Sequence, residues 1–187
     1  MSKGPVNRMP WAKDAAEPSP LLNREWLVAN GLGGYAAGTV SGVCTRRFHG
    51  LLVAGLPAPF GRMMMLNHLA EELRLPGREL LHLGAEELSE GELSVRSAAS
   101  LVEFRLEHGL PVWHFEAGGA VLEKTLVLAH LQNTVFVRYR LLAGPKVRLH
   151  IRPSLHFRSH EGRVDEPLTR PYALLSRGVR HEIRADD

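Results

Sequence analysis

The sequence has 187 residues, of which 44% are hydrophobic and 23% charged, and this length and composition predict one globular domain with a sizeable core. The net charge of +3 is modest, and a single cysteine, Cys44, excludes an internal disulfide and favours a reducing compartment. Since no apolar run reaches 18 residues, we expect no membrane-spanning helix and no membrane partner. The single cysteine leads us to expect a cytoplasmic location.

The chain opens with residues 1–20, which are rich in Pro, Ser and Ala and lack the apolar middle of a signal peptide. This composition predicts a loose leader that contains Trp11. The folded module is then expected over residues 21–187.

The stretch from Glu25 to Val53 contains six glycines, two adjacent arginines, a histidine, a tryptophan and a tyrosine. Asn30-Gly31 is a hairpin signal because both residue types tolerate a positive φ, so we expect strands over 25–29 and 35–40 around a glycine-rich turn. A third extended segment is expected over 45–55, and the whole stretch is interpreted as a backbone shaped to receive something.

Residues 31–36 also fit the GxGxxA fingerprint of dinucleotide-binding proteins. That fingerprint needs a helix next, but Gly38, Gly42 and the β-branched residues between and beside them are poor helix formers. No Asp or Glu follows within residues 51–66 to bind a ribose. We therefore reject a dinucleotide site.

The rest of the chain is predicted to be strands. Residues 62–88 carry leucines at helical spacing, but Pro76-Gly77 indicates a turn between two extended arms, and we interpret this span as strands. Period-2 alternation predicts a strand over 101–109 and hairpins over 112–129 and 134–152. Strands separated by Gly and Pro turns at this spacing favour an antiparallel sandwich.

From Arg138 to Arg184 the chain carries a local charge of +7, including a basic row on one face of the strand over 146–152. Such a face could hold nucleic acid, but few aromatic residues interleave with it, and a solvated face or an acidic partner domain is favoured. No nucleic-acid partner is predicted. The row consists of Lys146, Arg148, His150 and Arg152.

Metal and triad chemistry find little support. On a strand, His156 and His160 would lie about 13 Å apart, too far to share one ion, so we expect no metal and no cofactor. Ser41 and Ser154 are near histidines in sequence only, which is weak support for a triad. Cys44 has basic neighbours that would lower a thiol pKa, but a small buried hydrophobe is the favoured interpretation.

The segments EWL, NGLGGYA, GT and TRRFHGLLV within residues 25–53 resemble the opening motif of the N-terminal domain of bacterial and archaeal glycogen debranching enzymes, the amylo-α-1,6-glucosidases. The resemblance spans residues 21–160. Phe48 and Phe157 stand where the family usually has tyrosine. The later similar parts are Pro57, Pro59, Arg62, PVWHFEAGGAVLEKTLVL, NTVFVRYRLLAGP and IRPSLHFRSH.

This resemblance implies an antiparallel, supersandwich-like β-sandwich without its last strands, which would leave a sheet edge exposed. It also implies a non-catalytic N-terminal module that packs on a helical catalytic barrel, absent from this chain, and shapes its substrate entrance. The full-length enzyme would hydrolyse α-1,6-linked branch stubs of glycogen. The alternative is a free-standing α-glucan-binding module. Such a module would bind sugar rings by stacking on exposed Trp or Tyr, whereas Trp26 and Trp113 fall within strands and are expected in the core.

Glycoside hydrolysis requires two carboxylates that flank one bond, and the sequence lets us pair none of Glu71, Glu103 and Glu123. We therefore predict no catalytic residue in this chain.

The candidate substrate- or interface-contacting residues are Asn30, Tyr35, Arg46, Arg47 and His49. Alternation along an extended segment would turn Arg47 and His49 outward and Phe48 toward the core, and it would draw Arg46 inward unless a bulge at Gly42 or Gly50 changes the alternation. A buried Arg46 would need a carboxylate or carbonyl partner, for which Glu25 is a candidate. A direct contact with sugar or partner, and a purely structural role in tying the turn, both stay open.

Overall fold

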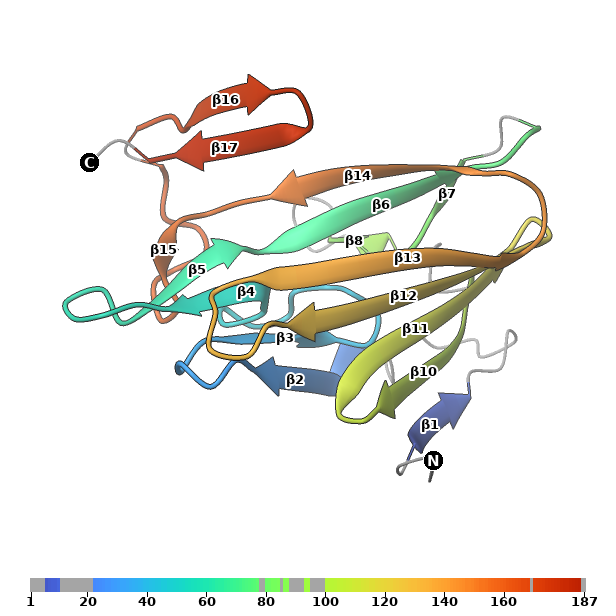
Figure 1. Cartoon of the computed structure of the whole chain (residues 1–187), viewed down its shortest axis with the longest axis horizontal. Coiled ribbons are helices and arrows are strands. Elements are labelled where there is room, and N and C mark those ends of the chain that lie inside the picture. Colours follow the sequence, from blue (N-terminus) through green and yellow to red (C-terminus); the bar gives the residue numbers. More distant parts are fainter. Residues whose placement is uncertain are drawn as a thin grey trace.

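The computed structural model describes residues 6–10, 22–77, 80–84, 86–87, 93–94, 100–168 and 170–185, and its strands form two facing layers (Figure 1). The expected all-β, antiparallel fold is confirmed. Within these ranges, no helix has the length and apolar character needed to cross a membrane. Sheet A, the first layer, consists of β1 (Val6–Pro10), β10 (Leu101–Glu107), β11 (Leu110–Ala117), β12 (Ala120–Leu128) and β13 (Val135–Ala143), in that order.

Sheets B and C together form the second layer. The chain passes almost directly from one to the other, because only Asn67 separates β5 of sheet B from β6 of sheet C. Sheet B consists of β15 (Arg158–Ser159), β5 (Arg62–Leu66), β4 (Gly50–Gly55), β3 (Tyr35–Thr39) and β2 (Glu25–Ala29), in that order. Sheet C consists of β14 (Arg148–Ser154), β6 (His68–Arg74) and β7 (Leu80–His82). Two separate hairpins are β8 (Glu86–Glu87) with β9 (Leu93–Ser94) and β16 (Ala173–Arg177) with β17 (Arg180–Arg184).

The core lies between the layers and is centred on two tryptophans. The rings of Trp26 and Trp113 meet edge to face at 5.3 Å, and Phe104 contacts Trp113 at 5.4 Å. The buried indole N–H groups donate to the carbonyls of Thr39 and Val40, so neither tryptophan leaves a buried donor without a partner. The expectation that both tryptophans belong to the core is confirmed, and each ring contributes about 2–3 kcal/mol by burial.

The span with helical leucine spacing is extended, as predicted, and forms β5, β6 and β7. Strand β6 pairs with β14 on one side and β7 on the other. Adjacent residues Ala70 and Glu71 are both buried, while Leu69 is half-buried. The helical spacing of Leu66, Leu69 and Leu73 runs across two strands, because Leu66 ends β5 and the other two leucines lie in β6.

The predicted hairpin over 134–152 is wrong, because β14 pairs with β6 in the opposite layer and not with β13. The turn at Gly144-Pro145 carries the chain from sheet A to sheet C (Figure 1). Val147 and Leu149 pack against the core from that second layer. Periodicity identifies both strands, but it does not distinguish a hairpin from a connection across a sandwich. All four side chains of the basic row are exposed, as expected.

Two segments differ from expectation in extent. Residues 45–49 form a turn, and β4 begins only at Gly50. Within the expected leader, Val6–Pro10 forms β1 and pairs with β10, whereas Trp11 lies outside the described residues.

Candidate functional site

The glycine-rich turn is organised by the side chain of Asn30, which is 0% exposed. Its Oδ1 accepts hydrogen bonds from the backbone N–H groups of Leu32 (2.9 Å) and Gly34 (3.0 Å). Its Nδ2 donates to the carbonyl of Gln132 (2.9 Å) and to Oδ1 of Asn133 (3.1 Å). Both polar atoms are therefore used inside the protein, and Asn30 shapes the turn.

Asn133 completes this arrangement and was missed as a candidate from the sequence. Its Oδ1 also accepts from the N–H of Gly55, and its Nδ2 donates to the carbonyl of the same residue, each at 2.9 Å. The side chain thereby imitates a neighbouring strand and joins the β12–β13 loop to the end of β4. An asparagine in the loop before β13 was the available signal, but its partner lies 78 positions away in sequence.

The turn over residues 45–49 reverses the predicted side-chain directions. The N–H of His49 donates to the carbonyl of Arg46 (3.0 Å), which closes the turn and breaks the alternation of an extended segment. The side chain of His49 is consequently buried, whereas Arg46, Arg47 and Phe48 are exposed. The prediction that His49 faces outward and that Arg46 and Phe48 face inward is wrong.

The predicted pair of Arg46 with Glu25 is confirmed, since Nε of Arg46 donates to Oε1 of Glu25. His49 lies beneath this pair, with its Nε2 3.5 Å from the same carboxylate oxygen. Its Nδ1 accepts from the N–H of Thr45 (3.2 Å), which places the proton of a neutral ring on Nε2. Burial lowers the pKa of His49, while the Glu25 carboxylate opposes that shift, so the ring is neutral at pH 7.

Arg47 and Phe48 lie on the outside of this turn. The Arg47 guanidinium stands over the Phe48 ring at 5.5 Å, and the Phe48 carbonyl accepts from the hydroxyl of Tyr35 (3.2 Å). The Arg47 carbonyl accepts from Nη2 of Arg158 (2.6 Å), a buried side chain that also donates to the carbonyls of Ser159 and Gly162. Arg158 thus fastens the turn to β15, and among the many arginines of the C-terminal region no sequence signal marked it.

Beside these groups lies a pocket of about 470 Å³ on the outer side of sheet B. It brings together three of the five sequence candidates, Tyr35, Arg46 and His49, whereas Asn30 and Arg47 do not line it. The lining residues are Glu25, Trp26, Leu27, Tyr35, Ala37, Arg46, Phe48, His49, Arg62 and His160.

The register of β2 and β3 shows how this pocket is laid out. Leu27 pairs with Ala37 in its middle, Glu25 pairs with Thr39 at one end, and Ala29 with Tyr35 at the other. The backbone of Glu25 therefore lies about 13 Å from that of Ala29 at the Tyr35 end, four residues along the strand. The pocket is thus elongated, with apolar residues in the middle and polar groups at both ends.

At the Tyr35 end, Nε of Arg62 donates to the carbonyl of Gly33 (2.7 Å), and the Tyr35 ring meets His160 edge to face at 6.3 Å. Burial raises the pKa of Tyr35, although the charges of Arg62 and Arg158 oppose this shift. The phenol is therefore a neutral hydrogen-bonding group at pH 7.

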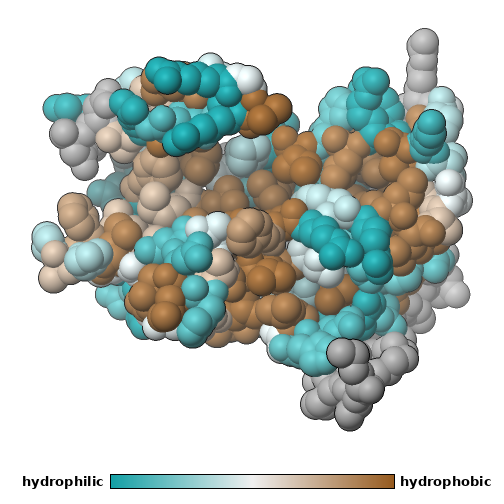
Figure 2. All heavy atoms as spheres, viewed as in Figure 1, coloured by the Kyte–Doolittle hydropathy of each residue, from teal (hydrophilic) through white to brown (hydrophobic). Residues whose placement is uncertain are grey.

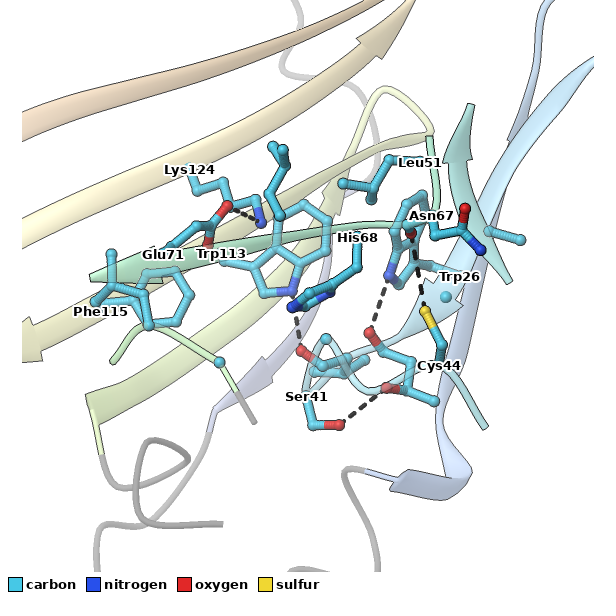
Figure 3. A pocket seen from close by; sticks show the side chains of 18 residues that line it. Trp26, Ser41, Cys44, Leu51, Asn67, His68, Glu71, Trp113, Phe115 and Lys124 are labelled. Atoms are coloured by element: carbon cyan, nitrogen blue, oxygen red, sulfur yellow. Dashed lines mark hydrogen bonds and ion pairs between the residues drawn. The ribbon is translucent and has the colours of Figure 1, made fainter. Parts of the chain in front are cut away.

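A second cavity, of only about 30 Å³, lies inside the sandwich and has room for about one water molecule (Figure 3). On its wall, Nζ of Lys124 lies 2.6 Å from Oε1 of the buried Glu71 and 5.2 Å from the centre of the Trp113 ring. The hydroxyl of Tyr139 also donates to Glu71, and burial raises the pKa of this phenol. This cluster ties β6 to β12 and β13.

Cys44 also lines the small cavity, where its Sγ donates to the Asn67 carbonyl at 3.8 Å (Figure 3). The residue is exposed, so the prediction of a buried hydrophobe is wrong. Cys44 is the first of five consecutive exposed residues that lead into the turn closed by His49 and Arg46.

The three carboxylates weighed for glycoside hydrolysis all hold cations. Glu71 binds Lys124, while Glu103 and Glu123 both bind Arg105. None of the three lines the 470 Å³ pocket. Across the part of the chain that the structure describes, no three His, Cys, Asp or Glu side chains converge as a metal ion would require.

Comparison with protein families accounts for nearly the whole folded part of the chain. The model of the family described as glycogen debranching enzyme N terminal matches residues 24–183. No curated protein and no solved structure matches the chain. The matched range covers every strand that forms sheets B and C, including the glycine-rich turn and the pocket. The chain therefore belongs to the family of glycogen debranching enzyme N-terminal domains.

Proposed function

We propose that this chain is a non-catalytic module that packs on the catalytic barrel of a glycogen debranching enzyme and contacts the α-glucan chain at the substrate entrance. The observation that carries the proposal is the elongated pocket of about 470 Å³ in which Tyr35, Arg46 and His49 converge. In the full-length enzyme the reaction is hydrolysis of the α-1,6-linked glucose stub.

The lining of the pocket suits a neutral sugar. Leu27 and Ala37 offer an apolar strip to the non-polar face of a glucose ring, and Phe48 and Tyr35 add aromatic edges. The polar groups at the two ends can exchange hydrogen bonds with hydroxyl groups. A volume within about 300–1,000 Å³, mostly apolar walls and a few placed polar groups are typical of small-molecule sites.

The same lining supports binding without hydrolysis. Glycosidases place two carboxylates about 5–9.5 Å apart across the scissile bond. Among the described residues that line the pocket, Glu25 is the only carboxylate, and it is bound by Arg46. The pocket therefore supports contact with a glucan, and the cleavage step is assigned to the barrel.

The second candidate function is a free-standing α-glucan-binding module. It is favoured by the exposure of the pocket in this chain, where Arg46 and Phe48 both reach solvent. Electrophoresis of the 187-residue chain in gels that contain glycogen separates the two functions. Clear retardation would favour the free-standing module, whereas unretarded migration would favour a pocket that binds only beside the barrel.

The proposal is tested in the full-length enzyme with Arg46→Ala and Arg62→Ala, one at each end of the pocket. We expect kcat/KM on a branched limit dextrin to fall about tenfold for each variant, which corresponds to about 1.4 kcal/mol. Melting temperatures should change little, because both arginines are exposed, the Arg46–Glu25 ion pair contributes about 0–1 kcal/mol, and exposed positions such as Arg62 contribute within about 0.5 kcal/mol. Arg180→Ala on β17 is the matched control, and unchanged kcat/KM in both pocket variants would refute the sugar contact.

A further inference from the structure

The two ends of the pocket of about 470 Å³ differ in their charge. At the end formed by Glu25, its carboxylate binds the Arg46 guanidinium, and the His49 ring beneath them is neutral at pH 7. The positive and negative charges at this end therefore cancel. Glu25 is also the only carboxylate among the described residues that line the pocket, so none lines the Tyr35 end.

The Tyr35 end is lined by Arg62 and His160, which lie side by side because the backbone N–H of His160 donates to the Arg62 carbonyl (3.1 Å). Nε of Arg62 binds the Gly33 carbonyl, whereas its two Nη groups bind no acceptor among the described residues. Nδ1 of His160 is buried and also has no hydrogen-bond partner there. Oε1 of Glu161 lies 3.9 Å from Nε2 of His160, but this side chain is 73% exposed, and solvent screens its charge.

A second cation, Arg158, lies behind this end and is only 7% exposed. Its Nη groups donate to four backbone carbonyls, and no carboxylate among the described residues binds it. Its Nε is buried without a hydrogen-bond partner. Carbonyl dipoles solvate a buried charge but do not cancel it. The charges of Arg62 and Arg158 both act to lower the pKa of the Tyr35 phenol, so the positive potential extends to the wall of the pocket.

This excess of positive charge favours an anion, and its size favours a phosphate monoester. Such an ester carries a charge of about −1.5 to −2 at pH 7, which matches the two arginines, whereas a carboxylate carries a single charge. The guanidinium of an arginine also binds phosphate oxygens through two N–H groups at once. The Tyr35 end therefore has both the charge and the donors of a phosphate site.

The opposite end suits hydroxyl groups. Oε1 of Glu25 accepts from Arg46, whereas Oε2 has no donor among the described residues and can accept a hydrogen bond from a sugar hydroxyl. Leu27 and Ala37 form the apolar strip between the two ends, and the backbone along β2 from Glu25 to Ala29 spans about 13 Å. This length accommodates a hexose ring together with one phosphate group.

We propose that the pocket takes a glucose unit that carries a phosphate monoester, with the phosphate at the Tyr35 end and free hydroxyl groups at the Glu25 end. This inference deepens the proposed function and rests on it for the place of the glucose ring on the apolar strip. Two sources share this chemistry. One is a free glucose phosphate, and the other is a phosphate ester on a glucan chain.

Isothermal titration calorimetry of the 187-residue chain tests the proposal with glucose, inorganic phosphate and glucose 6-phosphate. We expect glucose 6-phosphate to bind at least tenfold more tightly than either of the other two, because each of them fills only part of the pocket. Equal affinity for glucose 6-phosphate and one of these two would overturn the proposal. Absence of glucose 6-phosphate binding up to about 10 mM would overturn it as well, since every group assigned to the phosphate belongs to this chain.

Variants of Arg62 test where the phosphate binds. Arg62→Gln keeps hydrogen-bond donors but removes the charge, so it should weaken glucose 6-phosphate binding at least tenfold. Arg62→Lys retains the charge and should recover part of this loss. Arg180→Gln on the β16–β17 hairpin, over which Figure 2 shows mainly hydrophilic surface, is the matched control and should leave the affinity unchanged. Full affinity in Arg62→Gln would contradict a phosphate at the Tyr35 end.

A phosphorylated oligosaccharide distinguishes the two sources. The probe is maltotetraose with a phosphate ester on O6 of one glucose unit. Binding at least tenfold tighter than that of glucose 6-phosphate would assign the phosphate to a glucan chain. Equal or weaker binding would assign it to a free glucose phosphate. Both results support a phosphate site in the pocket.

The outcomes also separate this inference from the proposed function. Glucose 6-phosphate binding that is lost in Arg62→Gln, together with unchanged kcat/KM on unphosphorylated limit dextrin for Arg46→Ala and Arg62→Ala, would keep the phosphate site and reject the contact with the neutral glucan. A tenfold lower kcat/KM in those two variants, together with equal affinity of the chain for glucose and glucose 6-phosphate, would keep the glucan contact and reject the phosphate site.

Discussion

Two regions of the molecule are built from similar strands but differ in how they are held. One is the loop end, which consists of the β2–β3, β4–β5 and β12–β13 loops and the strand ends beside them, and the other is the C-terminal region, from the second half of β13 to β17. At the loop end, polar side chains from distant parts of the chain bind one another, as the buried Asn30 and the half-buried Asn133 do. In β14 and β16 almost every residue is exposed. The outer edges of β13 and β14 have no strand partner among the described residues (Figure 1).

This difference shows that the formation of a strand and its attachment to the rest of the fold by buried contacts and hydrogen bonds, which we call fastening, depend on different features of the sequence. Both regions have the period-2 pattern that selects strands, but fastening needs a covered face and satisfied polar groups. Local stability should follow fastening, with slow opening at the loop end and rapid opening at the C-terminal hairpin. The predictions below test this ordering.

The largest effect is expected at the cluster of Glu71, Lys124 and Tyr139, which joins β6 in the second layer to β12 and β13 in the first. Lys124→Met removes the cation beside the buried Glu71 and leaves its charge unpaired, which should cost about 3–5 kcal/mol in the free energy of unfolding. Urea denaturation measures this loss. Glu71→Leu combined with Lys124→Met and Tyr139→Phe should recover most of it, since apolar groups of similar volume replace both charges and the hydroxyl that donates to Glu71. A triple variant as unstable as the single one would show that packing, and not the unpaired charge, is responsible.

A slightly smaller loss is expected when the loop end is unfastened. Asn133→Ala leaves Nδ2 of Asn30 and both backbone groups of Gly55 without that partner. Unsatisfied buried groups cost about 1–3 kcal/mol each, and with partial access of water we expect a total of about 3 kcal/mol. Gln132→Ala is the matched control, because only its backbone carbonyl takes part. Equal stability of the two variants would remove the distinction between the regions.

The sequence predicted the strands better than their fastening. The turn residues Asn30-Gly31 and the alternation over 101–109 depend on neighbours within a few positions, and the structure confirms β2, β3 and β10 there. The pairing of β14 with β6 joins positions 74 (Arg148 and Arg74) to 86 (Ser154 and His68) residues apart, and no local pattern specifies it.

The same limit applied to the candidate site. Tyr35, Arg46 and His49 were found because they stand in one dense stretch, and the pocket brings them together. Asn133 and Arg158 were missed because their roles arise from backbone carbonyls and amides distant in sequence. The directions of Arg46 and His49 were wrong because a single turn hydrogen bond replaced the expected strand.

Gly34 offers an intermediate test at the loop end. A methyl group there would meet the nitrogen of Gly55 and the carbonyl of Val53 at 2.8 Å, and backbone atoms of paired strands have little room to move. We expect Gly34→Ala to cost about 2 kcal/mol by overpacking. Gly77→Ala is the control, because no atom lies within 4 Å of a Cβ at that position. Calorimetric melting of both variants measures the difference, and a neutral Gly34→Ala would show that the loop end is softer than its contacts indicate.

A smaller effect is expected from pH. Burial lowers the pKa of His49 below its ordinary value of 6.5, so the unfolded chain binds a proton more readily than the folded one. The stability that this contributes is fully present above pH 6.5 and declines as the pH falls below it. Urea denaturation at pH 7 and pH 5.5 should show the decline, and His49→Gln should reduce it. An NMR titration midpoint of the His49 ring above 6.5 would contradict the prediction.

The smallest effect is expected in the C-terminal hairpin. Leu174 and Ile183 face each other across β16 and β17, but Leu174 is 65% exposed, so Leu174→Ser removes little surface that folding had buried. We expect a loss of less than about 0.5 kcal/mol in the free energy of unfolding, as for other exposed positions.

The attachment of the β16–β17 hairpin to the sandwich includes Tyr172, whose ring stacks on Phe157 at 4.8 Å and whose hydroxyl accepts from the Phe157 N–H. Hydrogen exchange gives the sharper measurement, because the β16–β17 amides should exchange by local opening while the β3 amides exchange only with global unfolding. Tyr172→Ala should therefore accelerate exchange in the hairpin and leave β3 unchanged. If β3 accelerated equally, the two regions would unfold as one unit, and the contrast between fastened and unfastened strands would not govern the stability of this module.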